Sequence, residues 1–173
     1  MINIITGPDN TGKTTTALKL EKDTGLPLAL RYPKLPPTDG ENYYNWCMNR
    51  LFMGQDIDFL MDRGIVDEFI YGPILRGYMV FDRKDQIHNV IARLQDPKLT
   101  RIIYCNPSIK VQQLTLDERP QLDGIKTQIK VINNAFDYFL FVYPLAGANV
   151  ITYDFTKDGD YERLLSIIKG GQQ

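Results

Sequence analysis

Short apolar runs alternate with helix-like patterns along most of the chain, and this alternation predicts the fold. Runs typical of buried strands occur at residues 2–6, 27–31, 57–61, 101–105 and 149–152. Between them, apolar residues recur three or four positions apart, which is the spacing of one helix face. This spacing predicts helices at residues 13–22, 41–53, 68–78, 84–95, from about 108, 125–142 and 159–169. Strands that alternate with helices favour an α/β fold with a parallel sheet covered on both faces.

The carboxyl ends of the predicted strands are where a ligand is expected, because open parallel sheets bind ligands at that edge. The rule selects residues 7–14 after the first strand and Arg31 after the second. It also selects Asp62 and Arg63, which follow the third strand, and the stretch after Tyr153. Chemistry is therefore sought first in these segments.

The first of these segments is a phosphate-binding loop. Residues 7–14 read Gly-Pro-Asp-Asn-Thr-Gly-Lys-Thr, between a predicted strand and a predicted helix. Gly7 and Gly12 allow a tight turn and a close approach of backbone to phosphate. Lys13 would place a positive charge on the outer phosphates, and the Thr14 hydroxyl would ligate Mg²⁺. The other residues expected to contact the nucleotide are Asp9, Asn10, Thr11 and Thr15.

This motif predicts ATP and Mg²⁺ as cofactors. The alternative is that residues 7–14 form an ordinary glycine turn in a βα unit.

Asp62 and Arg63 form a second constellation at the end of the third predicted strand. An acidic residue there, downstream of a phosphate loop, is expected to hold the magnesium ion. Arg63 offers a rigid, permanently charged fork to phosphate oxygens. The alternative for this pair is an Asp-Arg cap on a turn.

Length and composition narrow the classes of partner. The chain has 173 residues, which suits one domain over residues 1–173. It carries 20 basic and 21 acidic residues, so no basic excess favours a nucleic-acid partner. No apolar stretch is long enough to span a bilayer, and the N-terminus shows no targeting pattern. With two isolated cysteines, these features lead us to expect a cytoplasmic protein with no membrane partner.

The phosphate loop, the Asp62-Arg63 pair and residues 67–72, which read Asp-Glu-Phe-Ile-Tyr-Gly, carry a family resemblance. Together they resemble the thymidylate kinase branch of nucleoside monophosphate kinases, and compact phage-encoded members in particular. The resemblance runs from residue 2 to about residue 143. It implies the three-layer P-loop nucleoside kinase fold, with a five-stranded parallel sheet, helices on both faces and a short lid at residues 117–124. It also implies a small-molecule nucleotide substrate and is compatible with a homodimer.

The resemblance implies roles for individual residues of the donor and acceptor sites. Lys13 and Thr14 would hold the donor triphosphate and Mg²⁺, with Asp62 near the metal or the transferred group. Arg63 would hold the acceptor phosphate. Arg50, late in the second predicted helix, resembles an arginine that reaches the same phosphate.

Three further residues complete the expected set. Arg119 would be the catalytic cation of the lid, while Arg31 and Tyr71 are expected to bind substrate. Two departures from the family pattern stand out. Residues 31–33 read Arg-Tyr-Pro where the family has Arg-Glu-Pro, and the lid carries fewer arginines than usual. Thymidine monophosphate itself is therefore not implied as the substrate.

We predict ATP- and Mg²⁺-dependent phosphoryl transfer to a deoxynucleoside monophosphate, which gives the diphosphate. A phosphate acceptor is already an anion, so it needs several cations but no strong base. A deoxynucleoside kinase remains an alternative, with Asp39, Glu41 or Asp62 as the base for a hydroxyl acceptor. A kinase of a modified base in DNA and a P-loop nucleotide-binding protein without kinase activity also remain open. The single histidine, His88, is expected to be exposed and to take no part in catalysis.

Overall fold

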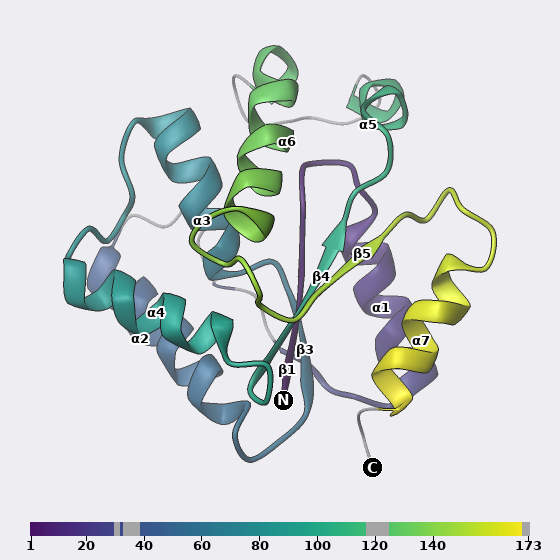
Figure 1. Cartoon of the computed structure of the whole chain (residues 1–173), viewed down its shortest axis with the longest axis horizontal. Helices are drawn as coiled ribbons and strands as arrows, with labels where there is room; N and C mark the ends of the chain where they lie inside the picture. The colour runs from purple at the N-terminus through teal and green to yellow at the C-terminus, as the bar shows by residue number, and fades with distance from the viewer. Residues whose placement is uncertain (30–31, 33–38, 117–124, 171–173) are drawn as a thin grey trace.

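A single parallel sheet forms the centre of the computed structural model, which describes residues 1–29, 32, 39–116 and 125–170. Five strands lie in the order β2-β3-β1-β4-β5, with β1 in the middle (Figure 1). They are β1 (Ile2–Thr6), β2 (Leu28–Ala29), β3 (Phe59–Asp62), β4 (Thr100–Cys105) and β5 (Val150–Tyr153). The α/β fold with five parallel strands is thereby confirmed.

Helices cover both faces of this sheet and make the fold three-layered. They are α1 (Lys13–Thr24), α2 (Gly40–Met53), α3 (Ile65–Tyr71), the π-helix η1 (Gly72–Arg76), α4 (Lys84–Gln95), α5 (Ile109–Leu116), α6 (Ile125–Phe141) and α7 (Asp160–Gly170). In Figure 1, α1 and α7 lie on the right of the strands, and α2 and α4 lie on the left. None of the helices in the described part of the chain is long and apolar enough to cross a membrane.

The helix predicted at residues 68–78 differs from the structure at both ends. It begins earlier, at Ile65, where the Asp67 carboxylate accepts the Gly64 backbone N–H at 3.0 Å and caps the first turn. Beyond Tyr71 the chain widens into η1, whose second residue, Pro73, has no N–H to donate to the preceding turn. The segment is therefore an α-helix followed by one π-helical turn.

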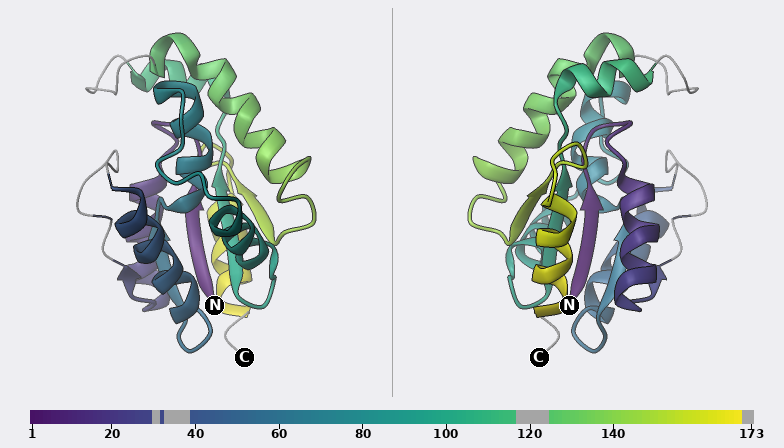
Figure 2. Two further views of the ribbon diagram at one scale, coloured as in Figure 1. Left: turned by 90° about the vertical axis from the view of Figure 1, so that its left-hand side faces the viewer. Right: turned by 90° about the vertical axis from the view of Figure 1, so that its right-hand side faces the viewer.

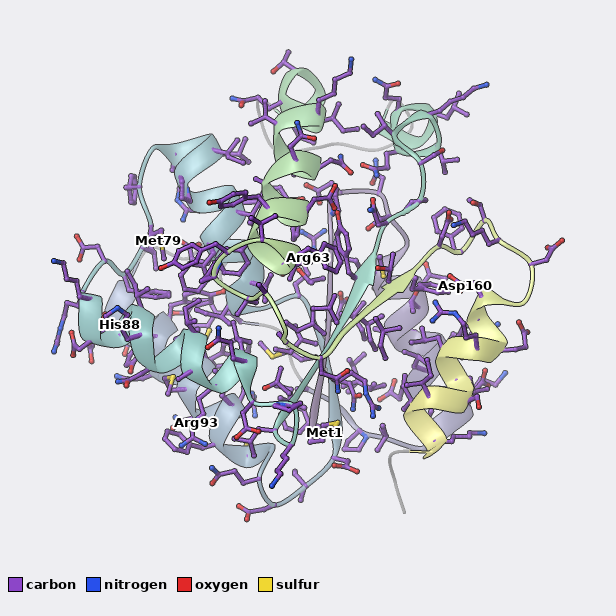
Figure 3. The ribbon with its side chains drawn as sticks, in the orientation of Figure 1. Met1, Arg63, Met79, His88, Arg93 and Asp160 are labelled. Atoms are coloured by element: carbon purple, nitrogen blue, oxygen red, sulfur yellow. The ribbon has the colours of Figure 1, made fainter. Side chains whose placement is uncertain are left out.

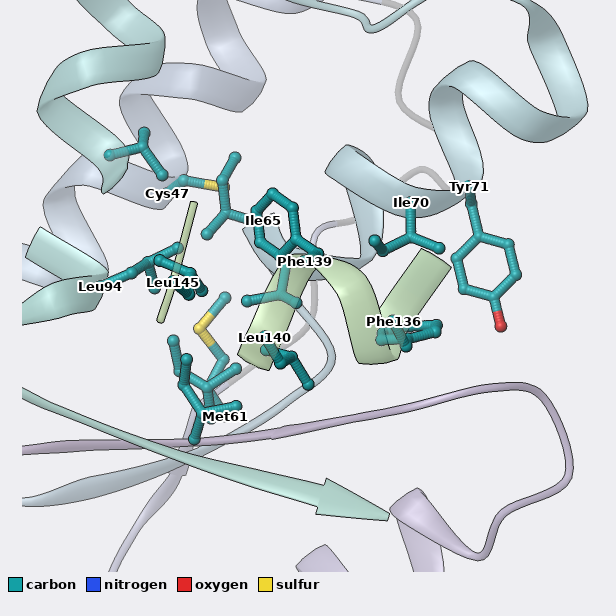
Figure 4. Close-up of a cluster of buried hydrophobic side chains, with 14 of the residues drawn as sticks. Cys47, Met61, Ile65, Ile70, Tyr71, Leu94, Phe136, Phe139, Leu140 and Leu145 are labelled. Atoms are coloured by element: carbon teal, nitrogen blue, oxygen red, sulfur yellow. The ribbon is translucent and has the colours of Figure 1, made fainter. Parts of the chain in front are cut away.

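Alternation along the strands divides the apolar residues between two cores. Ile2 and Ile4 pack in the larger core with side chains of α2, α3, α4 and α6, whereas Ile5 packs with α1 and α7. Figure 4 shows part of the larger core, with Met61 of β3 beneath Leu140 of α6. Because the three central strands, β1, β3 and β4, are buried along their whole length, they are a rigid base for the segments that leave the carboxyl edge of the sheet.

That edge is where the chain gathers its polar segments. β1 pairs with β3 and β4 in register, so that Ile5 lies beside Asp62 and Thr6 beside Tyr104. The phosphate loop leaves β1 at this point, and α5 and the start of α6 lie at the same end of the molecule, away from the N-terminus (Figure 2). The predicted lid, residues 117–124, lies outside the described residues.

Candidate active site

The phosphate loop is a tight turn that only glycine can close at its first position. Gly7 has φ 141°, and a Cβ there would lie 2.4 Å from the carbonyl oxygen of Cys105. Gly12 has φ 76° and begins α1, and a Cβ there would lie 3.2 Å from the Phe155 ring. The Thr11 hydroxyl donates to the Pro8 carbonyl at 2.8 Å and braces the turn. The positive end of α1 thus faces a loop of fixed shape, which is an arrangement that binds phosphate.

Lys13 lies inside this loop rather than in solvent. Its side chain is 3 % exposed, and Nζ donates to the carbonyls of Gly7, at 2.8 Å, and Pro8. Burial, and next the nearby Arg63 charge, lower the pKa of Lys13 to about 8, although Asp9 and Asp67 oppose the shift. The ammonium group therefore carries a charge that its surroundings only partly compensate, and phosphate oxygens would complete that compensation.

Thr14 and Asp62 are the residues that the sequence predicts as magnesium ligands. Thr14 is exposed on the first turn of α1, whereas Asp62 is buried at the end of β3. Alternation along β3 puts Asp62 on the same face as Leu60, which packs against α1. No group of three or more His, Cys, Asp or Glu residues that could hold a metal occurs in the described residues. One hydroxyl and one carboxylate therefore fit Mg²⁺, which keeps few protein ligands and takes the rest from phosphates and water.

Arg63 reaches the phosphate loop from the turn after β3. Its backbone has φ 67°, a left-handed conformation that costs free energy for a residue with a Cβ. Its N–H donates to the Ile5 carbonyl at 2.9 Å, and its guanidinium Nη2 lies 3.0 Å from Asp9 Oδ1. Burial alone would lower the pKa of Arg63, but Asp67 and Asp9 raise it. A permanent cation thus stands beside the loop that holds Lys13 (Figure 3).

Tyr71 completes the cluster on the side of the larger core. Its ring is 8 % exposed and lies at the margin of the apolar cluster in Figure 4. Burial, and then the charges of Asp9 and Asp67, raise the pKa of Tyr71 well above its ordinary value. The phenol therefore stays neutral and can donate a hydrogen bond. Of the predicted site residues, the structure brings Lys13, Asp9, Arg63 and Tyr71 together from separate segments.

Asp67 also belongs to this cluster, although the sequence analysis gave it no role beyond its place in the family resemblance of residues 67–72. It stands three residues after Gly64, and this capping-box spacing marks it as a helix-capping residue only. Its Oδ2 accepts the Gly64 N–H and the Thr6 hydroxyl, the latter at 3.1 Å. Burial raises the pKa of Asp67, while the charges of Arg63 and Lys13 lower it.

The structure does not bring Arg50 to this site. Arg50 lies in the last turn of α2, with Nη1 against the Met53 sulfur at 3.6 Å and its guanidinium 5.5 Å from the Trp46 ring. The helix continues to Gly54, where an added Cβ would lie 3.1 Å from the backbone nitrogen of Ile2, the first residue of β1. α2 runs back along the strands, so its final turn lies at the amino edge of the sheet, away from the phosphate loop.

The remaining expectations fall into two groups. Arg31 and Arg119 lie outside the described residues. His88 is exposed on α4, at the periphery in Figure 3, as predicted. Asp39 and Glu41 are exposed around the start of α2, where Asp39 caps the helix by accepting the Asn42 N–H at 3.1 Å. Asp39 therefore has a helix-capping role in this structure.

Comparison with known proteins identifies the fold. No family model matches the chain, and no curated protein matches it. Among solved structures, the YorR protein from Bacillus subtilis, in complex with phosphorylated GDP, is similar at a TM-score of 0.74 and 16 % identity, covering 98 % of this chain and 96 % of that one. Deoxyadenosine kinase from M. mycoides with bound dATP is similar at 0.62 and 17 %, covering 99 % of each chain. Thymidylate kinase from Candida albicans is similar at 0.56 and 15 %, covering 99 % of this chain and 92 % of that one.

These likenesses establish that the chain has the fold of the P-loop kinases. The three proteins include one named for a nucleoside and one named for a nucleoside monophosphate, so the fold alone does not select an acceptor. The narrower resemblance to the thymidylate kinase branch rests on the residues quoted from the sequence. Any activity of the chain must be argued from its own site.

Proposed function

We propose that this chain is a kinase that transfers a phosphoryl group from ATP, with Mg²⁺, to a deoxynucleoside monophosphate. The observation that carries the proposal is Arg63, whose strained turn holds a guanidinium 3.0 Å from Asp9 of the phosphate loop. Its charge is close enough to Lys13 to lower that pKa. Lys13 and Arg63 are therefore two cations that repel each other at one end of the sheet. Such a pair suits a site that holds two anionic ligands side by side.

The residues of the site would divide the work between the two ligands. The Lys13 ammonium would exchange the carbonyls of Gly7 and Pro8 for outer phosphate oxygens of the donor. Arg63 would leave Asp9 and grip the acceptor phosphate. Thr14 and Asp62 would hold Mg²⁺, which neutralises charge on the donor phosphates when it is bound.

The chemical step then needs alignment more than proton transfer. An acceptor phosphate oxygen forms a bond to the γ-phosphorus, the bond to the bridging oxygen breaks, and ADP leaves with that electron pair. Lys13 and Arg63 keep the two phosphate groups in line and offset the charge of the three equatorial oxygens. No side chain of the described cluster has to accept a proton in this step.

A deoxynucleoside acceptor is the second candidate, and the carboxylates of the site favour it. Asp9 is buried within the loop, and Asp67 stands beside Lys13 and Arg63. A hydroxyl acceptor needs a carboxylate within hydrogen-bond reach to take its proton. Asp9 would be the carboxylate released for this role if Arg63 moved to the donor phosphates. The two candidates therefore differ in which ligand Arg63 grips.

A coupled ADP-release assay against matched nucleosides and their monophosphates tests the proposal. We expect turnover with at least one deoxynucleoside monophosphate, and none with the matching nucleoside. Turnover with nucleosides alone would replace the first candidate with the second. ADP release with no member of the panel would overturn the assignment to nucleotide kinases. A Lys13→Ala preparation serves as the control for contaminating kinases.

A further inference from the structure

The Asp67 carboxylate joins two segments on which the proposed reaction depends. Its Oδ2 atom accepts the Thr6 hydroxyl at 3.1 Å and the Gly64 backbone N–H at 3.0 Å. Thr6 is the last residue of β1, directly before the phosphate loop, and Gly64 directly follows Arg63. The Asp67 N–H donates back to the Gly64 carbonyl at 3.1 Å. One side chain therefore ties the start of the loop to the turn that carries Arg63.

The Arg63 turn needs such a tie because its backbone is strained. With φ 67°, a residue with a Cβ returns to the ordinary region unless its neighbours hold it. The Ile5 carbonyl holds the Arg63 N–H from one side, at 2.9 Å. Asp67 holds the next backbone N–H, that of Gly64, from the other side. Without the Asp67 carboxylate the Gly64 N–H loses its partner, and we expect the guanidinium to be held less firmly toward Asp9.

Asp67 also sets the charge that an incoming anion meets. Its carboxylate favours the charged forms of both Lys13 and Arg63. Its other oxygen, Oδ1, is buried with no hydrogen-bond partner among the described residues, so helix capping does not account for the whole carboxylate. The other ionisable groups whose pKa its charge raises are Tyr43, Tyr71 and Cys105. A negative charge beside two phosphate-binding cations weakens the attraction of the site for polyanions.

We propose that Asp67 is a positioning residue with two separable effects on this site. Its hydrogen bonds hold Arg63 in the orientation that aligns the acceptor, and its negative charge lowers the affinity of the site for phosphate groups. Only the first effect rests on the proposed function, since it concerns turnover. The second effect concerns the binding of any polyphosphate and stands without an identified acceptor.

Two substitutions at Asp67 separate these effects. Asp67→Asn removes the charge and keeps an oxygen that accepts the Thr6 and Gly64 hydrogen bonds, whereas Asp67→Ala removes both. Affinity is measured by calorimetry with sodium tripolyphosphate, and kcat and KM by ADP release. Asp85→Asn is the matched control, because Asp85 is exposed on α4 and pairs with Arg83.

We expect Asp67→Asn to bind tripolyphosphate about five- to tenfold more tightly than the wild type, with kcat within about threefold. Asp67→Ala should have a kcat about tenfold lower than Asp67→Asn, because both lack the charge and only Ala lacks the hydrogen bonds. Asp85→Asn should match the wild type in both measurements. A purely structural role predicts lower thermal stability in both Asp67 variants and no tighter binding in either.

The proposal is overturned if Asp67→Asn binds tripolyphosphate no more tightly than the wild type, or if Asp67→Ala keeps the kcat of Asp67→Asn. Should Asp67→Ala fail to fold, Thr6→Val removes one of the two hydrogen bonds and keeps the shape of the side chain. Thr6→Val should then lower kcat about threefold at unchanged affinity. If the wild type binds tripolyphosphate but phosphorylates no acceptor, the proposed function is wrong. The effect of the Asp67 charge can still be measured in that case, from tripolyphosphate binding.

Discussion

Both edges of the sheet contain an arginine, half-buried at the carboxyl edge and buried at the amino edge, but only the carboxyl edge is built as a site. At the carboxyl edge, Arg63 pairs with Asp9 at 3.0 Å from a backbone with φ 67°. At the amino edge, Arg101 of β4 is 7 % exposed and donates to the neutral Asn3 side chain at 3.2 Å from an ordinary strand. Burial lowers the pKa of Arg101, although the charge of Asp58 raises it. A buried cation therefore does not mark a site by itself.

What distinguishes the carboxyl edge is strain combined with grouped charge. Among the described residues, the only non-glycine residues with positive φ are Asn10 and Arg63, and both border the phosphate loop. Lys13, Arg63 and the carboxylates that compensate them come from different segments, which meet only there. Strain of this kind persists where the surrounding structure holds it and where function uses the resulting geometry. At the amino edge, charges also gather at Met1, Asp58 and Arg101, but no described residue other than glycine has a positive φ there.

The largest expected effect that tests this contrast is the loss of the lysine inside the loop. Lys13→Ala should lower kcat by about 100- to 1,000-fold, because the charge that develops on the transferred group is left without its nearest cation. ADP release with a single acceptor measures this loss of kcat. Lys98→Ala, an exposed lysine outside the site, is the control and should keep full activity. Equal losses in both variants would mean that Lys13 has no specific role.

The same substitution at Arg63 and at Arg101 compares the two edges directly. Arg63→Met should lower turnover about 100-fold and leave ATP binding largely intact, since Arg63 acts on the acceptor. Arg101→Met should leave turnover unchanged and alter the free energy of unfolding by less than about 1 kcal/mol, because a well-packed apolar side chain commonly replaces a buried cation without loss. Kinetics measure the turnover of the two variants, and thermal unfolding measures their stability. A loss of ATP binding in Arg63→Met would place Arg63 in the donor site instead.

How well each feature could be predicted from the sequence depends on whether neighbouring residues encode it. The phosphate loop is a local pattern of this kind, and so are the strand at residues 2–6 and the helix at residues 84–95, which have the predicted bounds in the structure. How far along the strands a side chain lies depends on the direction in which its helix packs against the sheet, which periodicity does not give. Arg50 has the residue type of an acceptor ligand, but α2 carries it to the amino edge.

Asp67 is the opposite case to Arg50, because it lies in the site although the sequence predicted no role for it there. Its partners, Thr6, Gly64, Lys13 and Arg63, come from three segments that meet only once the sheet has formed. The capping-box spacing marks the start of a helix, and it gives no sign that the same carboxylate faces two cations. Sites of this kind follow from the register of β1 against β3, which no local pattern specifies.

Glycine at the start of the phosphate loop and glycine after α1 allow a third comparison, in stability. Gly7→Ala, at the first position of the loop, should cost about 2 to 4 kcal/mol, because the new Cβ would lie 2.4 Å from the Cys105 carbonyl oxygen and φ is 141°. Gly25→Ala, after α1, should cost only about 1 kcal/mol, because φ is 73° but nothing lies within 4 Å of the new Cβ. Urea unfolding of both variants measures the difference. Equal costs would show that the loop relaxes and is not held rigidly against β4.

The remaining expected effect is a pH dependence that arises at the carboxyl edge alone. The pKa of Lys13 is lowered from 10.5 to about 8, so the folded chain binds fewer protons than the unfolded chain between these values. Stability should therefore rise with pH over this window, by up to about 3 kcal/mol from this residue, and the rise should be absent in Lys13→Met.

Ligand binding should show the opposite trend, because phosphate oxygens need the charged lysine. Above about pH 8 the affinity for ATP should fall by up to about tenfold per pH unit, as the Lys13 ammonium loses its proton in the ligand-free chain. Calorimetry between pH 7 and about pH 9.5 measures it, with Arg101→Met as the control that should retain the wild-type slope. Lys13→Met should bind weakly at every pH and show no such slope. If Lys13→Met keeps the pH dependence of ATP affinity, another group is titrating. The buried lysine would then no longer distinguish the carboxyl edge from the amino edge.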